Sequence, residues 1–260
     1  TFKYLYICLR TCLRADNRKA QEQRLTGTDH REIVVRCIHS LVKSINHAVA
    51  HNPDLVLNFI ILDDHSDTPG RNSLECLQKK AKCDTSIITT KARGQGESLL
   101  QQFKYARERD GLFYFCEDDY LHEKTAINEM VHFYRHVYDM FDTHLVLHPQ
   151  EHEFLYIRSL YPSYLLQGEN RHWRTISHAT HVLFMHSDLV KKYWDYFSNT
   201  RYVGDRSRRR KGVESRTTNR LFEHVPGFAP LPALAAHMQT ERTLPPFFDW
   251  RPLWEENRLE

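Results

Sequence analysis

The sequence predicts an α/β protein whose mostly parallel sheet is covered by helices on both faces. Two features of the first 150 residues support this. Short apolar runs without polar alternation recur, which is typical of strands buried on both faces. Segments between these runs repeat their apolar residues at helical spacing. This alternation favours parallel crossovers. The 260 residues, 41% of them hydrophobic, suffice for one compact domain.

The expected elements follow in order. FKYLYICL is a strand, and residues 30–50 form a helix because Ile33, Cys37 and Leu41 lie on one face. The rest of the first half alternates between strands at LVLNFIILDD, TSIITT and GLFYFCEDD and helices near NSLECLQKKAK and GESLLQQFKYARERD. A helix over residues 125–141 comes next, and the pattern then loosens. LVLHP, HVLFMH and ALAAHM are typical of later strands, whereas residues 201–216 are polar and very basic.

Charge and composition exclude several classes of protein. The 36 basic and 33 acidic side chains nearly cancel, which argues against a protein that binds nucleic acid. No apolar stretch is long enough to span a bilayer, and the first residues become charged too soon for a signal peptide. The six cysteines form no disulfide framework, which favours buried, reduced thiols. We therefore expect a soluble, cytoplasmic protein. The 17 histidines show no zinc-binding spacing.

Acidic residues follow two of the expected strands. Ligands of parallel sheets bind at the carboxyl ends of the strands. The five acidic residues at these ends are Asp63 and Asp64 after FIIL, and Glu117, Asp118 and Asp119 after LFYFC. If the two strands are close in the sheet, these carboxylates face one cleft.

The second acidic cluster points to a divalent cation. Mg²⁺ and Mn²⁺ favour oxygen ligands and complete a shell of one or two carboxylates with water or phosphate oxygens. A nucleotide diphosphate would supply such oxygens. A solvated turn or helix cap is the alternative interpretation of Glu117, Asp118 and Asp119. A structural turn is likewise the alternative for Asp63 and Asp64.

Two glycines precede the helix that starts near residue 96. Gly94 and Gly96 permit close backbone approach at a helix N-terminus, where a phosphate would bind, although the same residues also suit a simple turn. Their spacing is neither GxGxxG nor GxxxxGK[ST]. The sequence therefore argues against a dinucleotide site and a P-loop.

Taken together, these motifs resemble the GT-A fold glycosyltransferases, particularly the family 2-like inverting enzymes, over residues 3–240. The motifs are the strand end LRT, then FIILDDHSD, ARGQGESLLQQFKYA and FYFCEDDY, which stands where that family keeps its DXD-type motif. The resemblance implies transfer of a sugar from a nucleotide-diphosphate sugar, a UDP-sugar being favoured, to a hydroxyl of a carbohydrate or glycoconjugate. It implies one domain over residues 1–260, with residues 1–122 binding the donor and residues 123–260 the acceptor.

The resemblance also implies roles for individual residues. Arg10 and Thr11 would form part of the nucleotide pocket wall. Asp64, with Asp63, would bind the base, and Asp118 would face the ribose or sugar. Gly94 and Gly96 would admit the donor. Asp119 would be the principal ligand of Mn²⁺ or Mg²⁺, with Glu117 as the first acid of the motif. His237 resembles the histidine that many GT-A enzymes add to the metal, and a core or surface histidine is the alternative.

Inverting transfer requires a base that deprotonates the acceptor hydroxyl. Glu214 matches the family's position best, Asp205 is the reserve candidate, and a helix cap is the alternative for Glu214. The sequence departs here from the family's common ED or DxD form. Two further groups of residues have a functional interpretation, with a solvated loop or core packing as the alternative. They are a basic run that would cover the diphosphate (Arg206, Arg208, Arg209, Arg210, Lys211) and aromatic residues that would hold an acceptor sugar (Tyr161, Tyr164, His172, Trp173).

Two other functions fit parts of the sequence. A nucleotidyltransferase that makes nucleotide sugars shares the sheet and the metal carboxylates, but it usually carries a glycine-rich loop after its first strand. LRTCLRADNRKA contains no glycine. A non-catalytic carbohydrate-binding protein would explain the aromatic residues but does not need acidic residues at a strand end.

Overall fold

A nine-stranded sheet forms the centre of the computed structural model, which describes residues 2–14, 25, 29–91, 93–153 and 162–259. The strand order is β3-β2-β1-β4-β9-β6-β10-β8-β7. The bounds are β1 (Tyr4–Thr11), β2 (Val56–Asp63), β3 (Asp84–Thr89), β4 (Leu112–Glu117), β6 (Val146–Leu147), β7 (Leu165–Gln167), β8 (His172–Ile176), β9 (Leu183–His186) and β10 (Gly227–Leu231). A separate antiparallel pair joins β5 (Tyr120–His122) to β11 (Ala235–His237).

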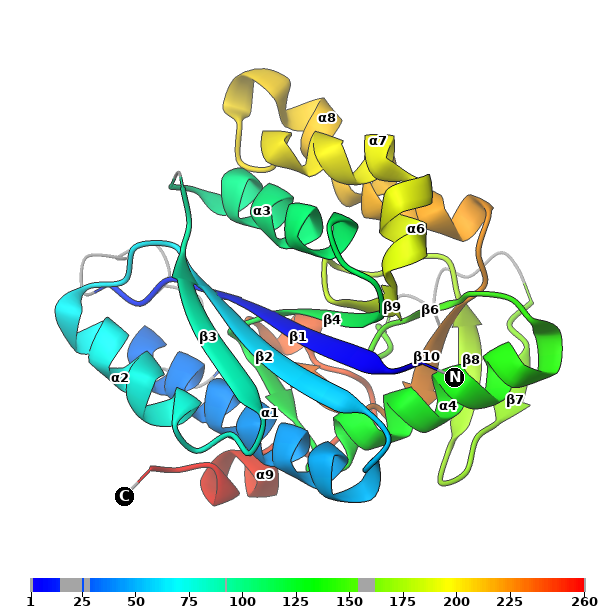
Figure 1. Cartoon of the computed structure of the whole chain (residues 1–260), viewed down its shortest axis with the longest axis horizontal. Helices are drawn as coiled ribbons and strands as arrows, with labels where there is room; N and C mark the ends of the chain where they lie inside the picture. Colours follow the sequence, from blue (N-terminus) through cyan, green and yellow to red (C-terminus); the bar gives the residue numbers. More distant parts are fainter. Residues whose placement is uncertain (1, 15–24, 26–28, 92, 154–161, 260) are drawn as a thin grey trace.

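Helices lie on both sides of this sheet (Figure 1). On one side are α3 (Gln95–Arg107), α6 (Ser187–Lys192), α7 (Trp194–Ser198) and α8 (Arg209–Gly212). On the other are α1 (His30–His51), α2 (Thr68–Gln78), α4 (Ala126–Phe141) and α9 (Trp250–Glu256). None of the helices in the described parts of the chain combines the length and apolar character needed to cross a bilayer. The predicted α/β sheet flanked by helices is confirmed.

The parallel strands predicted for the first half pair in the order β3-β2-β1-β4. Within this block, Arg10 at the end of β1 lies between Leu62 of β2 and Glu117 of β4. The pairs β4 with β9, β9 with β6, β10 with β8 and β8 with β7 are antiparallel, and β6 with β10 is parallel. The carboxyl ends of β1, β2 and β4 therefore meet at one edge, which brings the two acidic clusters together.

The central strands are apolar on both faces because each face has its own core. Successive side chains of a strand point to opposite faces. Tyr114 and Cys116 of β4 accordingly belong to the core under α1 and α4, whereas Phe113 and Phe115 belong to the core under α3. This explains why the strands appear in the sequence as uninterrupted apolar runs.

Two local features differ from expectation. Helix α2 begins at Thr68, before the expected start near residue 72, because the Asp67 carboxylate accepts a hydrogen bond from Gly70 N at 2.7 Å and Pro69 fits the first turn. The cysteines are not uniformly buried: Cys76 is exposed, so the expectation of buried thiols is wrong for this residue.

Candidate active site

A cavity of about 500 Å³ opens beyond the carboxyl ends of β1, β2 and β4. Seven of its lining residues were predicted from the sequence: Arg10, Thr11, Asp64, Glu117, Asp118, Asp119 and His237. The others are Cys12, His30, Gln95, Ser98 and Gln239. The edge of the sheet therefore places acidic, basic and hydroxyl groups around one space, where a polar ligand would bind.

Three of these side chains have the arrangement of a metal site. Glu117, Asp119 and His237 each offer a ligand atom, and these atoms lie within 4.8 Å of one another. His237 Nε2 is 3.3 Å from Asp119 Oδ2. Strand β11 pairs with β5 so that His237 lies opposite Tyr120, and the two rings stack with centroids 4.5 Å apart. This pairing fixes His237 beside the acids that follow β4.

Arg10 is the cation nearest the cluster. Its buried guanidinium contacts the Glu117 carboxylate and donates to Ser98 Oγ at 3.1 Å. Three acidic side chains, Glu117, Asp118 and Asp119, thus lie around this one arginine. A divalent cation would fit this local excess of negative charge.

Asp118 shows the effect of this crowding. Its Oδ2 accepts hydrogen bonds from Thr11 Oγ1 at 2.7 Å and from Cys12 N at 3.3 Å. Burial and the charge of Asp119 nevertheless raise the pKa of Asp118 to about 6. Burial disfavours the charged carboxylate, and a neighbouring carboxylate adds repulsion. These effects outweigh the two hydrogen bonds and the charge of Arg10.

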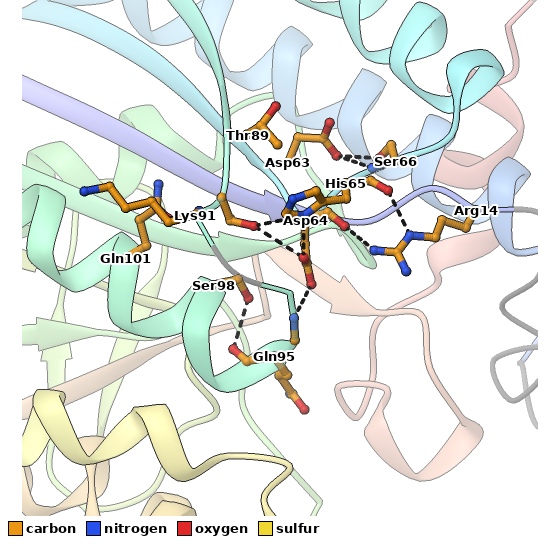
Figure 2. Close-up of polar contacts among 12 residues, drawn as sticks. Arg14, Asp63, Asp64, His65, Ser66, Thr89, Lys91, Gln95, Ser98 and Gln101 are labelled. Carbon is orange, nitrogen blue, oxygen red and sulfur yellow. Dashed lines mark hydrogen bonds and ion pairs between the residues drawn. The ribbon is translucent and has the colours of Figure 1, made fainter.

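Asp63 and Asp64 point in different directions (Figure 2). Asp64 Oδ2 accepts from Gly94 N at 2.9 Å, which connects the end of β2 to the start of α3. Asp63 instead accepts from Ser66 N at 2.9 Å and pairs with Arg71 at 3.2 Å. Asp63 does not line the cavity, because consecutive residues at a strand end face opposite sides. The structure therefore contradicts its expected place beside a bound base.

The two predicted glycines have separate roles. Gly94 has a φ of +111° and caps α3, a conformation that favours glycine. Gly96 packs against a neighbouring segment, since an added Cβ would lie 2.4 Å from the Arg201 carbonyl oxygen and 2.8 Å from that of Val203. Neither glycine is among the cavity-lining residues. The expectation that Gly96 admits a ligand is replaced by a role in helix packing.

The two predicted bases lie outside the set of cavity-lining residues. Glu214, in the short helix η4 (Glu214–Arg216), is 48% exposed, and its Oε1 lies 3.9 Å from His181 Nδ1. Asp205 Oδ1 accepts from Ser207 N at 2.9 Å and from Ser207 Oγ at 2.7 Å, and these bonds lower the pKa of Asp205. Asp205 therefore stabilises a turn.

His181 is buried beside Glu214 and was not singled out from the sequence. Burial lowers its pKa to about 4, while the charges of Glu117 and Arg10 act on it in opposite directions. His181 begins the run HVLFMH, so only its place at a strand start could have drawn attention to it. Ser98 was also missed, although it lies in the quoted segment GESLLQQFKYARERD.

The basic run and the aromatic group are placed only in part. Arg208 and Lys211 lie over the Tyr202 ring at 5.1 and 5.6 Å from its centroid. Trp173 is buried and stacks on Phe133 at 4.2 Å, which favours the core interpretation of this residue. Tyr161 and the side chains of Arg206 and Arg209 lie outside the described residues.

Comparisons with known proteins were made for the whole chain. A search of curated proteins finds no match. One similar solved structure is Staphylococcus aureus TarS, with 13% identity, a TM-score of 0.42, and coverage of 74% of this chain and 29% of that chain. Its fragment 1–349 in complex with UDP-GlcNAc has 12% identity and a TM-score of 0.42, and the match covers 73% of this chain and 47% of that chain. UDP-glucose pyrophosphorylase from Acinetobacter baumanii has 8% identity and a TM-score of 0.47, and the match covers 99% of this chain and 92% of that chain. The chain thus spans less than half of either TarS chain.

The family comparison covers most of the chain. A model described as glycosyl transferase family 2 matches residues 29–197. The matched region contains β2, α3 and the acidic residues after β4, which carry three of the four motifs of the resemblance, whereas the strand end LRT precedes it. Since the match extends over more than half of the 260 residues, the chain belongs to glycosyl transferase family 2, as its motifs predict.

Proposed function

We propose that the chain transfers a sugar from a nucleotide-diphosphate sugar to a hydroxyl of a carbohydrate acceptor, with Mn²⁺ or Mg²⁺ held by Asp119, Glu117 and His237. One observation carries this proposal. His237 meets Asp119 across 118 residues of sequence, in a polar cavity at the carboxyl ends of parallel strands. Such convergence of distant ligand types is typical of a functional site.

The ligand set fits this class of metal. Mn²⁺ accepts carboxylate and imidazole ligands, and Mg²⁺ prefers oxygen. Asp119 Oδ2 and His237 Nε2 are 3.3 Å apart, whereas the Glu117 carboxylate already pairs with Arg10. We therefore assign Asp119 as the principal ligand and Glu117 as a weaker one. A bound ion would neutralise charge on the diphosphate leaving group.

The remaining cavity residues would bind the donor. Asp64 accepts from Gly94 N through Oδ2 and from Thr90 Oγ1 through Oδ1 at 3.3 Å, and a carboxylate with about four acceptor positions could also accept from an N–H of the base. Asp118 would accept from ribose or sugar hydroxyls, and Thr11 orients it through a 2.7 Å hydrogen bond. Arg10 would stabilise the leaving diphosphate. A UDP-sugar is the donor to test first.

Glu214 is our candidate for the general base of an inverting transfer. Its Oε1 lies 3.9 Å from the Nδ1 atom of buried His181, and the charges of Glu117 and Arg10 also act on that imidazole. Asp205 is the weaker candidate because hydrogen bonds from Ser207 lower its pKa, and a lower pKa weakens a base.

Donor binding and acceptor binding would be divided only approximately between the two halves of the chain. We propose that residues 1–122 bind the donor and that residues 123–260 bind the acceptor within one domain. His237 and Gln239 line the cavity together with residues of the first half. The second half would therefore also contribute to the metal site.

The test is a transfer assay across UDP-, GDP-, dTDP- and CMP-sugars with Mn²⁺, Mg²⁺ or EDTA. The proposal expects activity with one donor, lost in EDTA and reduced at least about 100-fold in Asp119→Asn. Asp139→Asn, an exposed acid on α4, is the matched control and should keep full activity. Formation of a nucleotide sugar from a nucleoside triphosphate and a sugar 1-phosphate would instead favour the nucleotidyltransferase. Absence of both turnover and metal-dependent nucleotide binding would favour a binding protein.

A further inference from the structure

The turn that follows β2 has an uncommon backbone conformation beside the cavity. His65, directly after Asp64, has a φ of +60°. A positive φ is unfavourable for a residue that carries a Cβ atom, and such residues persist only where their surroundings hold them, often at ligand sites. Asp64 lines the cavity, so this conformation lies one residue from the carboxylate that we assign to the base. The contacts that hold the turn therefore bear on the cavity.

The guanidinium of Arg14 contacts this turn through two carbonyl groups (Figure 2). Arg14 Nη2 donates to Asp64 O at 2.7 Å, and Arg14 Nε donates to His65 O at 2.8 Å. These carbonyl groups belong to the two peptide planes on either side of the His65 Cα atom. Because a peptide unit and a guanidinium are both planar and rigid, holding both carbonyls fixes the φ and ψ of His65.

The backbone that precedes Arg14 is bonded to the same turn. Asp64 N donates to Thr11 O at 2.8 Å, at the end of β1. Two residues further on, Leu13 N donates to Ser66 Oγ, also at 2.8 Å. The segment that leaves β1 and the turn that leaves β2 therefore run side by side, and the Arg14 side chain starts from a fixed position.

The orientation of the Asp64 carboxylate depends on this backbone. Its Oδ2 accepts from Gly94 N at 2.9 Å, and its Oδ1 accepts from Thr90 Oγ1 at 3.3 Å. His65 Nδ1 lies 3.2 Å from the same Oδ1. A rotation of the peptide between Asp64 and His65 would disturb all three contacts. Since a carboxylate has about four acceptor positions, these contacts leave one for a ligand.

We propose that Arg14 is a positioning residue for nucleotide binding. By holding the peptide planes around His65, it keeps the Asp64 carboxylate in place to accept a hydrogen bond from an N–H of the donor's base. This inference rests on the proposed function, in which Asp64 binds the base. Arg14 is not among the residues that line the cavity, so it acts through Asp64 and not by contact with the nucleotide.

Arg14→Lys tests this role with the charge retained. An ammonium group is a single point charge and cannot hold two carbonyl oxygens in the fixed geometry of a guanidinium. We expect the Kd of UDP to rise at least about 10-fold, which corresponds to the loss of one hydrogen bond to a charged group. Binding of inorganic pyrophosphate with Mn²⁺ should stay unchanged, because pyrophosphate has no base and the proposed metal ligands follow β4 and lie in β11.

The experiment is calorimetric titration of UDP and of pyrophosphate in the presence of Mn²⁺, with wild type, Arg14→Lys, Asp64→Ala and the double variant. Because Arg14 acts through Asp64, its replacement should weaken UDP binding in the wild type but not in the Asp64→Ala background. Hydrogen exchange of the amides of residues 64–66 needs no ligand and should be faster in Arg14→Lys. The matched control is Arg31→Lys, since Arg31 pairs with Asp67 at 3.0 Å and should leave UDP binding unchanged.

The outcomes separate this inference from the proposed function. A wild-type protein that does not bind UDP with Mn²⁺ overturns both. If the wild type binds UDP and Arg14→Lys binds it as tightly, only the role of Arg14 is overturned. Equal weakening of UDP and pyrophosphate binding in Arg14→Lys would indicate a general structural role and would also overturn it. So would additive losses of UDP affinity in the double variant, because they would show that Arg14 does not act through Asp64.

Discussion

Acidification is expected to destabilise the fold through histidines that are buried without charge. His122 in β5 is 1% exposed, and its Nε2 lies 2.7 Å from Tyr114 Oη. Burial lowers the pKa of His122 to about 4, compared with about 6.5 in an unfolded chain. Between pH 7.5 and 5.5, His122 therefore stays neutral in the folded protein but becomes protonated in the unfolded chain.

The sign and size of the effect follow from this difference. Because the unfolded state takes up the proton, the stability contributed by neutral His122 is complete above about pH 6.5 and is lost as the pH falls toward 4. From pH 7.5 to 5.5, one such histidine lowers the free energy of unfolding by about 1.4 kcal/mol. His148 is also buried, and burial lowers its pKa to about 3. The two together would remove about 3 kcal/mol from a total of about 5–15 kcal/mol.

The assay is urea unfolding in metal-free buffer at the two pH values. In His122→Gln the amide can still accept from Tyr114 but does not titrate, so the loss between pH 7.5 and 5.5 should shrink by about 1.4 kcal/mol relative to wild type. Tyr114→Phe removes the hydroxyl and keeps the imidazole, so it should retain most of the pH dependence. An unchanged pH dependence in His122→Gln, within about 0.3 kcal/mol, would refute the reasoning.

Three further predictions concern the cavity and its surroundings. Gly96→Ala places a methyl group 2.4 Å from the Arg201 carbonyl oxygen and should lower the melting temperature, measured by differential scanning calorimetry, by more than about 5 °C. Gly94→Ala meets open space, so its effect on the melting temperature should come only from the strain of its positive φ. Arg71→Ala leaves buried Asp63 without its cation, so it should lower the free energy of unfolding, measured in urea, by about 1–3 kcal/mol. The Mn²⁺ affinity measured by calorimetric titration should stay unchanged, and a weakened affinity would contradict this prediction. Glu214→Gln should reduce kcat by about 100-fold or more with little change in donor KM, whereas Asp205→Asn should have a small effect; equal kcat values would exclude Glu214 as the base.

The first half of the fold could be predicted because its sequence pattern has one simple interpretation. Strands that are apolar on both faces must be covered on both faces, and the helices between them force parallel pairing. The strand order that places β1 beside β4 was not fixed by this pattern and comes from the structure. The later strands β6 and β9 are only 2 and 4 residues long, and such short runs do not specify their partners.

His237 illustrates the limit of prediction for the site. Its contact with Asp119 depends on the pairing of two three-residue strands, β5 and β11, which no local pattern indicates. The resemblance to a family supplied that expectation, and the residues alone left a core histidine equally open. Glu214 and Asp205 were harder still, because the basic segment around them contains only short helices whose packing depends on tertiary contacts such as Gly96 against Arg201.

Asp63 could have been assigned correctly from the sequence, because the pleat of a strand decides which of two consecutive residues faces a ligand. Phe59 and Ile61 of β2 belong to the core under α1, as does Leu57, so Asp63 continues that face and Asp64 begins the other. The α3 face carries Ile60 and Leu62, and α3 is also the helix whose N-terminus receives Asp64 through Gly94. Because side chains alternate along a buried strand, Asp64 faces the cavity, whereas Asp63 pairs with Arg71 and accepts a hydrogen bond from Ser66 N in the turn.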